Sequence, residues 1–136
     1  MNFFDEIFQN SDVLSRMKIF KNITKQFKND YVVFDIETTG TSIYYSEPVQ
    51  ISAVKVCNGK MIDKFDTLVK PKRPSSDEAI VVNHITNEML ISAPSFQEVY
   101  YKFKQYIENF TLVGYNIRRF DLPLLNTRVK GLIFRL

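Results

Sequence analysis

One stretch of the sequence decides the fold: Tyr31-Val32-Val33-Phe34-Asp35-Ile36-Glu37-Thr38-Thr39-Gly40. Its first four residues are apolar and favour β-structure, as in a central strand that is covered on both faces. Asp35 and Glu37 are two residues apart, so on a strand their carboxylates point to the same face, with Cα atoms roughly 6.5 Å apart. Two anions held this close at the end of a buried strand repel each other, and a bound cation relieves the repulsion.

The acid pair therefore predicts a metal site. Oxygen ligands suit Mg²⁺ or Mn²⁺, and two such ions about 3.5–4 Å apart can share them in phosphodiester hydrolysis. The alternative is a pair of solvated acids where the strand frays into a loop, because Asp-x-Glu occurs often by chance. The buried strand before the acids and the Gly40 turn after them favour the metal site.

Composition bounds the class of protein. A chain of 136 residues with 45% hydrophobic residues is long enough for one domain with its own core. A net charge of +3, from 18 basic and 15 acidic residues, permits a polyanionic partner without requiring one. The lone Cys57 excludes an intramolecular disulfide and is expected in a buried strand. Without an apolar run of about 18 residues or a signal peptide, we expect a cytoplasmic protein that does not enter membranes.

The chain divides into two parts by its patterning. Residues 1–30 are predicted to form an N-terminal helical extension, and residues 31–136 carry the motifs. Apolar residues recur at helical spacing in the extension, at Val13, Met17, Phe20, Thr24 and Phe27. Its opposite face is basic, which indicates either a solvated surface or a contact with phosphates, and we favour the former.

Three further strands and one well-defined helix are predicted after the first strand. The strands cover residues 49–56, 61–69 and 111–116, and the turn at Asn58-Gly59 indicates a hairpin between the first two. A capping box starts the helix, which covers residues 95–109. Because this helix links the strand at Tyr31 to the strand at 111–116, these two strands are expected to be parallel neighbours.

Several other polar residues have structural interpretations. Asp63 and Asp66 are expected to be solvent-facing charges on the third strand. The region 77–90 is predicted to form two short helical turns, with Thr86 capping the second. His84 is the only histidine, and a structural role is favoured over a catalytic one because no carboxylate or nucleophile lies beside it in the sequence.

A third carboxylate is predicted to join the acid pair. Asp121 lies near the start of a helix that begins at about Arg118, directly after the fourth strand. The carboxyl ends of parallel strands form the crevice in which open α/β sheets bind ligands, so Asp121 should converge with Asp35 and Glu37. Arg118 and Arg119 are candidates for contacts with substrate phosphates, or are ordinary surface arginines at a helix start.

These motifs together resemble the DEDD, or DnaQ-like, family of 3′–5′ exonucleases, which includes the proofreading subunit of bacterial DNA polymerase III. The first motif of that family is similar to Asp35-Ile36-Glu37-Thr38-Thr39-Gly40. Its middle segment is similar to Asn83-His84-Ile85-Thr86 and to Ala93-Pro94-Ser95-Phe96, and its second motif to Val113-Gly114-Tyr115-Asn116 with Phe120-Asp121. The resemblance covers about residues 31–125.

The resemblance implies a fold and a mechanism. The fold would be ribonuclease-H-like, an α/β mixed sheet flanked by helices, with the second strand antiparallel to the others. Asp35 and Glu37 would hold two Mg²⁺ or Mn²⁺ ions, and Asp121 would support the second ion. Thr38 and Thr39 would lie by the terminal nucleotide, and Asn116 would join the arginines in binding the substrate. The partners implied are the 3′ ends of DNA or RNA and polymerase subunits.

The resemblance also leads us to expect an incomplete domain. The third motif of the family, a histidine or tyrosine base followed by a fourth acid, lies tens of residues beyond the second, and the end of the sequence, Thr127 to Leu136, contains no acid and no histidine. We therefore expect weak or absent turnover, and an exposed sheet edge that could mediate self-association. The alternative function is a non-catalytic module that binds nucleic acid or protein through the same cleft.

Overall fold

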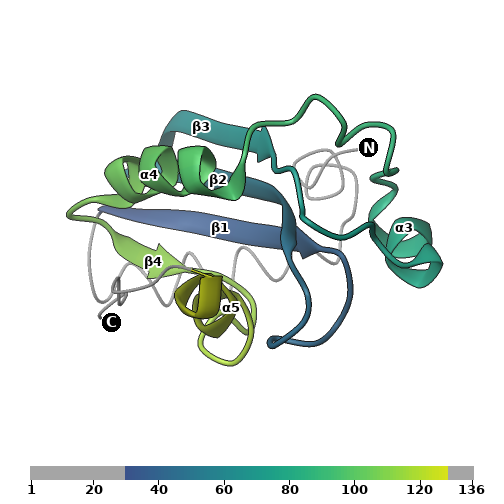
Figure 1. Cartoon of the computed structure of the whole chain (residues 1–136). Helices are drawn as coiled ribbons and strands as arrows, with labels where there is room; N and C mark the ends of the chain where they lie inside the picture. Colours follow the sequence, from purple (N-terminus) through teal and green to yellow (C-terminus); the bar gives the residue numbers. More distant parts are fainter. Residues whose placement is uncertain (1–29, 129–136) are drawn as a thin grey trace.

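The computed structural model describes residues 30–128, so the predicted N-terminal helix and the C-terminal tail lie outside the described residues. The elements follow one another in a strand-rich first half and a helical second half (Figure 1). They are β1 (Asp30–Thr38), β2 (Pro48–Cys57), β3 (Lys60–Leu68), α3 (Asp77–Asn83), α4 (Phe96–Ile107), β4 (Thr111–Val113) and α5 (Asp121–Arg128). None of the helices in this part of the chain is long and apolar enough to cross a membrane.

The strands form one mixed sheet in the order β3-β2-β1-β4. β2 pairs antiparallel with both β1 and β3, whereas β4 lies parallel to β1. Asn58 and Gly59 have positive φ angles of 51° and 76°, as the predicted hairpin turn between β2 and β3 requires. The sheet topology therefore confirms the predicted parallel pair and the predicted antiparallel second strand.

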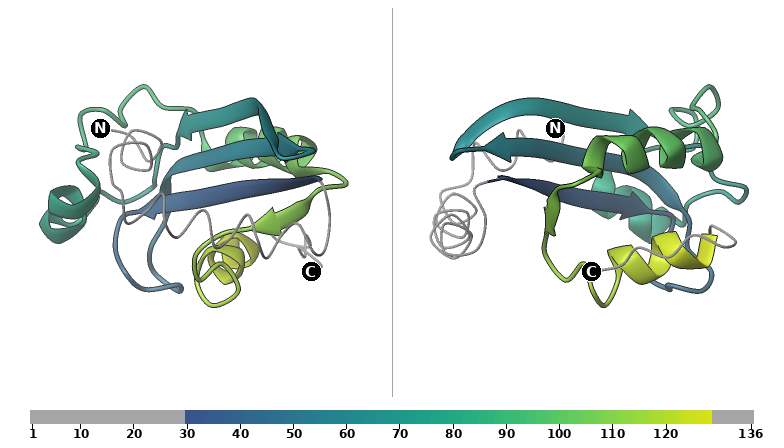
Figure 2. Two further views of the ribbon diagram at one scale, coloured as in Figure 1. Left: turned by 180° about the vertical axis from the view of Figure 1, so that it is seen from behind. Right: turned by 90° about the vertical axis from the view of Figure 1, so that its left-hand side faces the viewer.

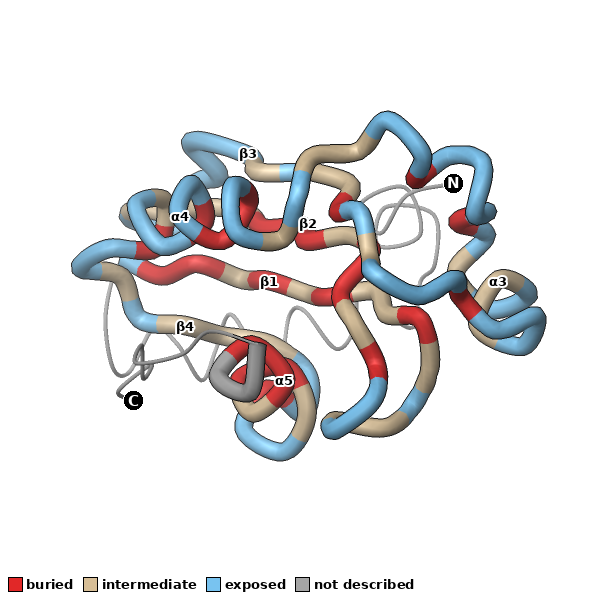
Figure 3. The backbone as a smooth tube through the Cα atoms, viewed as in Figure 1, coloured by how far each residue is buried: buried red, intermediate tan, exposed pale blue. Residues whose placement is uncertain are grey.

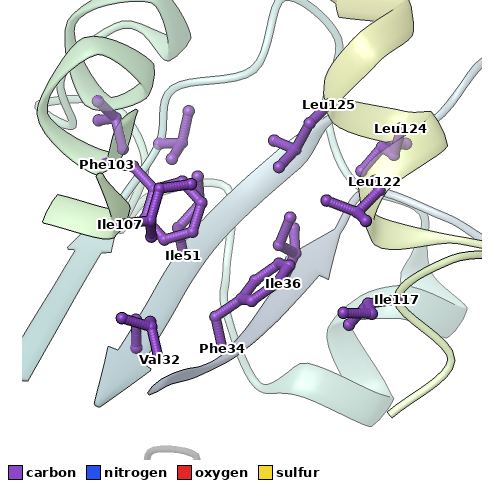
Figure 4. Close-up of a cluster of buried hydrophobic side chains, with 13 residues drawn as sticks. Val32, Phe34, Ile36, Ile51, Phe103, Ile107, Ile117, Leu122, Leu124 and Leu125 are labelled. Atoms are coloured by element: carbon purple, nitrogen blue, oxygen red, sulfur yellow. The ribbon is translucent and has the colours of Figure 1, made fainter. Parts of the chain in front are cut away.

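Two helices, α4 and α5, cover the same face of the sheet (Figure 2). The core between them contains Val32, Phe34 and Ile36 of β1, which point toward the helices (Figure 4). Phe103 of α4 is fully buried, and its ring centroid lies 5.4 Å from that of Phe34 and 5.6 Å from that of Phe65. This packing fixes α4, the predicted helix, across the middle of the sheet.

The structure corrects four predictions about the limits and environment of these elements. β1 alternates between buried and partly buried residues, so it is not covered equally on both faces (Figure 3). β4 has three residues instead of six, and α5 begins at Asp121 instead of Arg118. Cys57 is only partly buried. The region 77–90 forms α3 and then a turn that starts at residue 87, in which the amide of Met89 donates to Oγ1 of Thr86 at 3.3 Å, so the second predicted turn and its cap at Thr86 are confirmed.

Candidate active site

Asp35 and Glu37 lie within β1 and not beyond its end. They alternate with Phe34 and Ile36, whose side chains enter the core, so both carboxylates lie on the opposite face of the sheet. The pairing of β1 with β2 is regular up to Glu37 and shifts at Thr38. Such a bulge re-aims the chain beside functional sites, and here it ends the strand directly after the second acid.

The short strand β4 explains how Asp121 approaches these acids from the helical side of the sheet. β4 pairs with β1 only as far as Val33, which leaves the acid-bearing half of β1 without a described strand neighbour on that edge. The chain turns at Gly114, where an added Cβ would lie 2.8 Å from the backbone oxygen of Phe34. Only glycine allows this close approach, which brings the start of α5 to the open edge of β1.

Asp121 is a buried acid with a strongly raised pKa. It is 4% exposed, and burial together with the negative charges of Asp35 and Glu37 raises its pKa to about 7. Burial disfavours the ionised carboxylate, and like charges add to that effect. The three acids that the sequence analysis singled out therefore share one electrostatic environment.

The donor chemistry of this trio fits a divalent cation, since all three groups supply carboxylate oxygens. Within residues 30–128, however, no three His, Cys, Asp or Glu side chains are arranged so that they could hold a metal ion. The three acids therefore fit a divalent cation by the chemistry and charge of their oxygen atoms, although their side chains do not form a complete set of metal ligands in this structure.

Thr38 and Thr39 form a turn that is held by its own loop. The amide of Thr39 donates to the carbonyl of Glu47 at 2.9 Å, and the amide of Glu47 donates to Oγ1 of Thr39 at 3.0 Å. The hydroxyl of Thr38 donates to the carbonyl of Gly40. These reciprocal bonds close the loop between β1 and β2 and hold the turn directly beside Glu37.

Asn83 is a residue of the site region that the sequence analysis passed over. Its Nδ2 donates to the carbonyl of Thr38 at 3.1 Å, and its Oδ1 accepts from the amide of Ile85 at 3.0 Å. His84, which drew attention as the only histidine, is exposed and ends α3 in a left-handed conformation. The similarity of Asn83-His84 to the family's middle segment was a sign that this position matters. It did not indicate that the asparagine, and not the histidine, contacts the turn after β1.

The predicted substrate-binding residues after β4 are all exposed. Asn116 has a positive φ of 55°, and its carbonyl accepts from the amides of Arg119 and Phe120 at 3.1 and 3.0 Å. This turn leads into α5 and carries Arg118 and Arg119 on its outer surface. The arginines therefore lie two and three residues from Asp121, with their side chains available to solvent.

Asp66 is more than the solvated charge that was predicted. It is exposed, yet its Oδ1 accepts hydrogen bonds from Nε2 of Gln50 at 2.9 Å and from Oγ of Ser52 at 3.0 Å. Gln50 and Ser52 are the direct cross-strand partners of Glu37 and Asp35. Hydrogen bonds thus join β2 to β3 at the two positions that pair with the acids of β1.

Comparison with known proteins identifies the class of fold first. Crystal structures of exonuclease I superimpose on the chain, among them the complex of the Escherichia coli enzyme with a dT13 oligonucleotide (TM-score 0.65, 19% identity, 72% of this chain and 23% of that chain). A product-bound structure of exonuclease I gives a TM-score of 0.66 at 19% identity and covers 72% of this chain and 24% of that one. The fold is therefore the ribonuclease-H-like exonuclease fold.

The family follows from the sequence. The RNase T family model, described as exonuclease, matches residues 32–135, and the chain belongs to this family. DNA polymerase III PolC-type of Pediococcus pentosaceus is 41% identical over 97 residues, which are 71% of this chain and 7% of that protein. The PolC-type protein of Staphylococcus aureus is 40% identical over 104 residues, or 76% of this chain and 7% of that protein. The chain thus spans a small part of the length of these relatives, and the resemblance to DnaQ-like exonucleases is confirmed.

Proposed function

We propose that the chain carries a metal-dependent 3′–5′ exonuclease site formed by Asp35, Glu37 and Asp121. The observation that carries the proposal is the burial of Asp121 beside the charges of the two strand acids. A structural role does not explain why a carboxyl group is buried where its ionised form is disfavoured. Carboxyl groups with strongly shifted pKa values cluster at functional sites. Membership of the exonuclease family supports the reaction class.

Each acid has a separate part in the proposed site. Asp35 and Glu37 would hold two Mg²⁺ or Mn²⁺ ions from the surface of β1, and Asp121 would support the second ion from the start of α5. When bound, divalent ions stabilise charge on a scissile phosphate and lower the pKa of an attacking water. Ionisation of Asp121 is favoured by that positive charge, which reverses the effect of burial.

The surrounding residues position the substrate in this proposal. The turn at Thr38 and Thr39 contacts the terminal nucleotide, because it is fixed next to Glu37 by its loop and by Asn83. Arg118 and Arg119 neutralise phosphates, and Asn116 orients the turn that carries them.

The test is a nuclease assay with single-stranded DNA and RNA labelled at the 5′ end. Wild type with Mg²⁺ or Mn²⁺ should shorten the strand slowly and stepwise from the 3′ end, in line with the weak turnover expected, and EDTA should stop the reaction. Asp35→Asn and Asp121→Asn should fall to background, whereas Asp63→Asn, an exposed acid of β3, should retain wild-type turnover.

Two results would overturn the proposal. Immediate release of the 5′-labelled nucleotide would indicate the opposite polarity. Binding of the strand without any shortening at high protein concentration would assign the chain to the alternative function, a non-catalytic nucleic-acid-binding module.

The likeness to PolC-type DNA polymerase III supports a narrower substrate, the 3′ end of a primer beside a polymerase. An unpaired 3′ end can enter a recessed site as a single strand, whereas a paired end must first be separated. We therefore expect faster removal of a mismatched terminal nucleotide than of a paired one on the same primer–template. Equal rates would contradict this part of the proposal.

A further inference from the structure

Two exposed tyrosines lie in the loop that follows the acids of β1. Tyr44 is 71% exposed and Tyr45 is 75% exposed, although tyrosine side chains are intermediate in burial on average. The loop leaves β1 at Thr39 and returns to β2 at Glu47, and the two hydrogen bonds between these residues hold both of its ends. Both ends of the loop that carries the tyrosines therefore lie at Thr39, two residues after Glu37.

Hydrogen bonds to Ser42, a residue of the same loop, hold the backbone of these tyrosines. Oγ of Ser42 accepts from the amide of Tyr44 at 3.2 Å and from that of Tyr45 at 3.3 Å. The carbonyl of Ser42 also accepts from the amide of Ser46 at 2.9 Å. Aromatic residues on an ordered loop lose little conformational entropy when a ligand contacts them.

A second loop brings two basic residues beside this one. The carboxylate of Glu47 accepts from the backbone amides of Lys72 and Arg73 at 2.9 and 3.0 Å, while both side chains are exposed. The amide of Ser76 donates to the carbonyl of Thr39 at 3.1 Å, which ties the same segment to the turn after β1. Glu47 thus joins an aromatic loop to a basic loop.

We propose that Tyr44, Tyr45, Lys72 and Arg73 form a binding track for the unpaired nucleic-acid strand upstream of the terminal nucleotide. This proposal rests on the proposed function. Tyrosine rings stack on bases of any sequence, and basic side chains follow the phosphates, a combination typical of single-strand binding. The loop between β1 and β2 follows the C-terminal end of β1 and lies near α5 in the views of Figures 1 and 2, so the track begins beside the two elements that carry the acids.

Binding of fluorescent single-stranded DNA to the full chain in EDTA tests the tyrosines, because the strand stays intact whether or not the chain is active. Tyr44→Ala and Tyr45→Ala should each weaken binding of a dodecanucleotide by about 5- to 150-fold, the range for loss of one stacked base. Tyr45→Phe, which keeps the ring, should bind like wild type. Tyr101→Ala, which removes an exposed tyrosine of α4, is the matched control and should bind normally.

The salt dependence tests the basic residues. Lys72→Ala and Arg73→Ala should each reduce the slope of log affinity against log salt by about 0.7, the value for one phosphate contact in a single strand. Lys60→Ala, at the turn between β2 and β3, removes one exposed charge at the other end of β2 and should leave the slope unchanged.

Outcomes for the track and for the proposed function are distinguishable. The track is overturned if both tyrosine variants bind the dodecanucleotide within about twofold of wild type, or if they lose affinity for a trinucleotide by the same factor. If the tyrosine variants bind DNA more weakly than wild type but wild type cleaves no strand, the track is retained and the exonuclease function is rejected. Tyrosine-dependent capture of a protein with no effect on DNA binding would also overturn it.

Discussion

Asn83 donates a hydrogen bond from Nδ2 to the backbone carbonyl of Thr38, at 3.1 Å, between residues that lie 45 positions apart in the sequence. The bond joins the end of α3 to the turn that follows the two acids of β1. Because Oδ1 of the same side chain accepts from the amide of Ile85, the asparagine bridges two segments and uses both of its polar atoms.

Asn83→Asp should remove the bond to Thr38 and keep the bond to Ile85. The carboxylate retains an acceptor for the amide of Ile85 but has no donor for the carbonyl of Thr38, which it repels instead. We expect a loss of roughly 1–3 kcal/mol in the free energy of unfolding and weaker substrate binding. Asn87→Ala, which loses a bond to Ser75 instead, should lower stability without the same effect on substrate. Unchanged substrate binding by Asn83→Asp would contradict a role for this bond in positioning the turn.

The pH dependence of stability should report the ionisation of Asp121. Its pKa rises from 3.8 to about 7 on folding, so between these values the folded state retains a proton that the unfolded state has released. The free energy of unfolding of the metal-free chain should therefore fall as pH rises through this range, by up to about 4 kcal/mol.

Urea denaturation in EDTA at about pH 5 and about pH 8 measures this change. Asp121→Asn cannot ionise at this position and should lose that part of the decrease, so it should be more stable than wild type at the higher pH. Identical pH profiles for the two proteins would show that Asp121 ionises as freely in the folded chain as in the unfolded one.

Divalent cations should stabilise the folded chain if the acids bind them together. A cation at 100 times its dissociation constant adds about 2.7 kcal/mol to the free energy of unfolding. The melting temperature should rise with Mn²⁺ in wild type and in Asp63→Asn, and the rise should be lost in Asp35→Asn. An equal rise in all three proteins would indicate metal binding elsewhere.

Gly114→Ala should displace the turn that carries Asp121. The added Cβ would lie 2.4 Å from Cγ2 of Ile117 and 2.8 Å from the backbone oxygen of Phe34. Overpacking of this kind costs about 1–3 kcal/mol, and nuclease activity should fall as well. The added substitution Ile117→Ala removes only the first clash, because the second is with backbone. Full recovery of activity in the double variant would contradict the proposed contact with β1.

Phe103→Ala should be the most destabilising of these changes. The ring is fully buried between Phe34 and Phe65, and its removal leaves a cavity under α4, with an expected loss of about 3–5 kcal/mol in the free energy of unfolding. Lys102→Ala, at an exposed position of the same helix, should change stability by less than about 0.5 kcal/mol. Comparable losses for both variants would mean that α4 does not pack as described.

The local patterns of the sequence determined most of the sheet and the identity of the three acids. Alternation of side chains on a strand placed Asp35 and Glu37 on one face, and the turn at Asn58-Gly59 specified the hairpin, because both depend on backbone geometry over a few residues. The family resemblance rested on the same short motifs, and it was confirmed.

Only the tertiary structure decided how these parts meet. The early end of β4, the close approach of Gly114 to Phe34 and the bond from Asn83 to Thr38 all join segments that are far apart in the sequence, so no local pattern specifies them. The raised pKa of Asp121 likewise depends on burial and on charges contributed by another element. Sequence periodicity reports which face of its own element a residue occupies, whereas burial and electrostatic interactions depend on what the rest of the chain brings to that face.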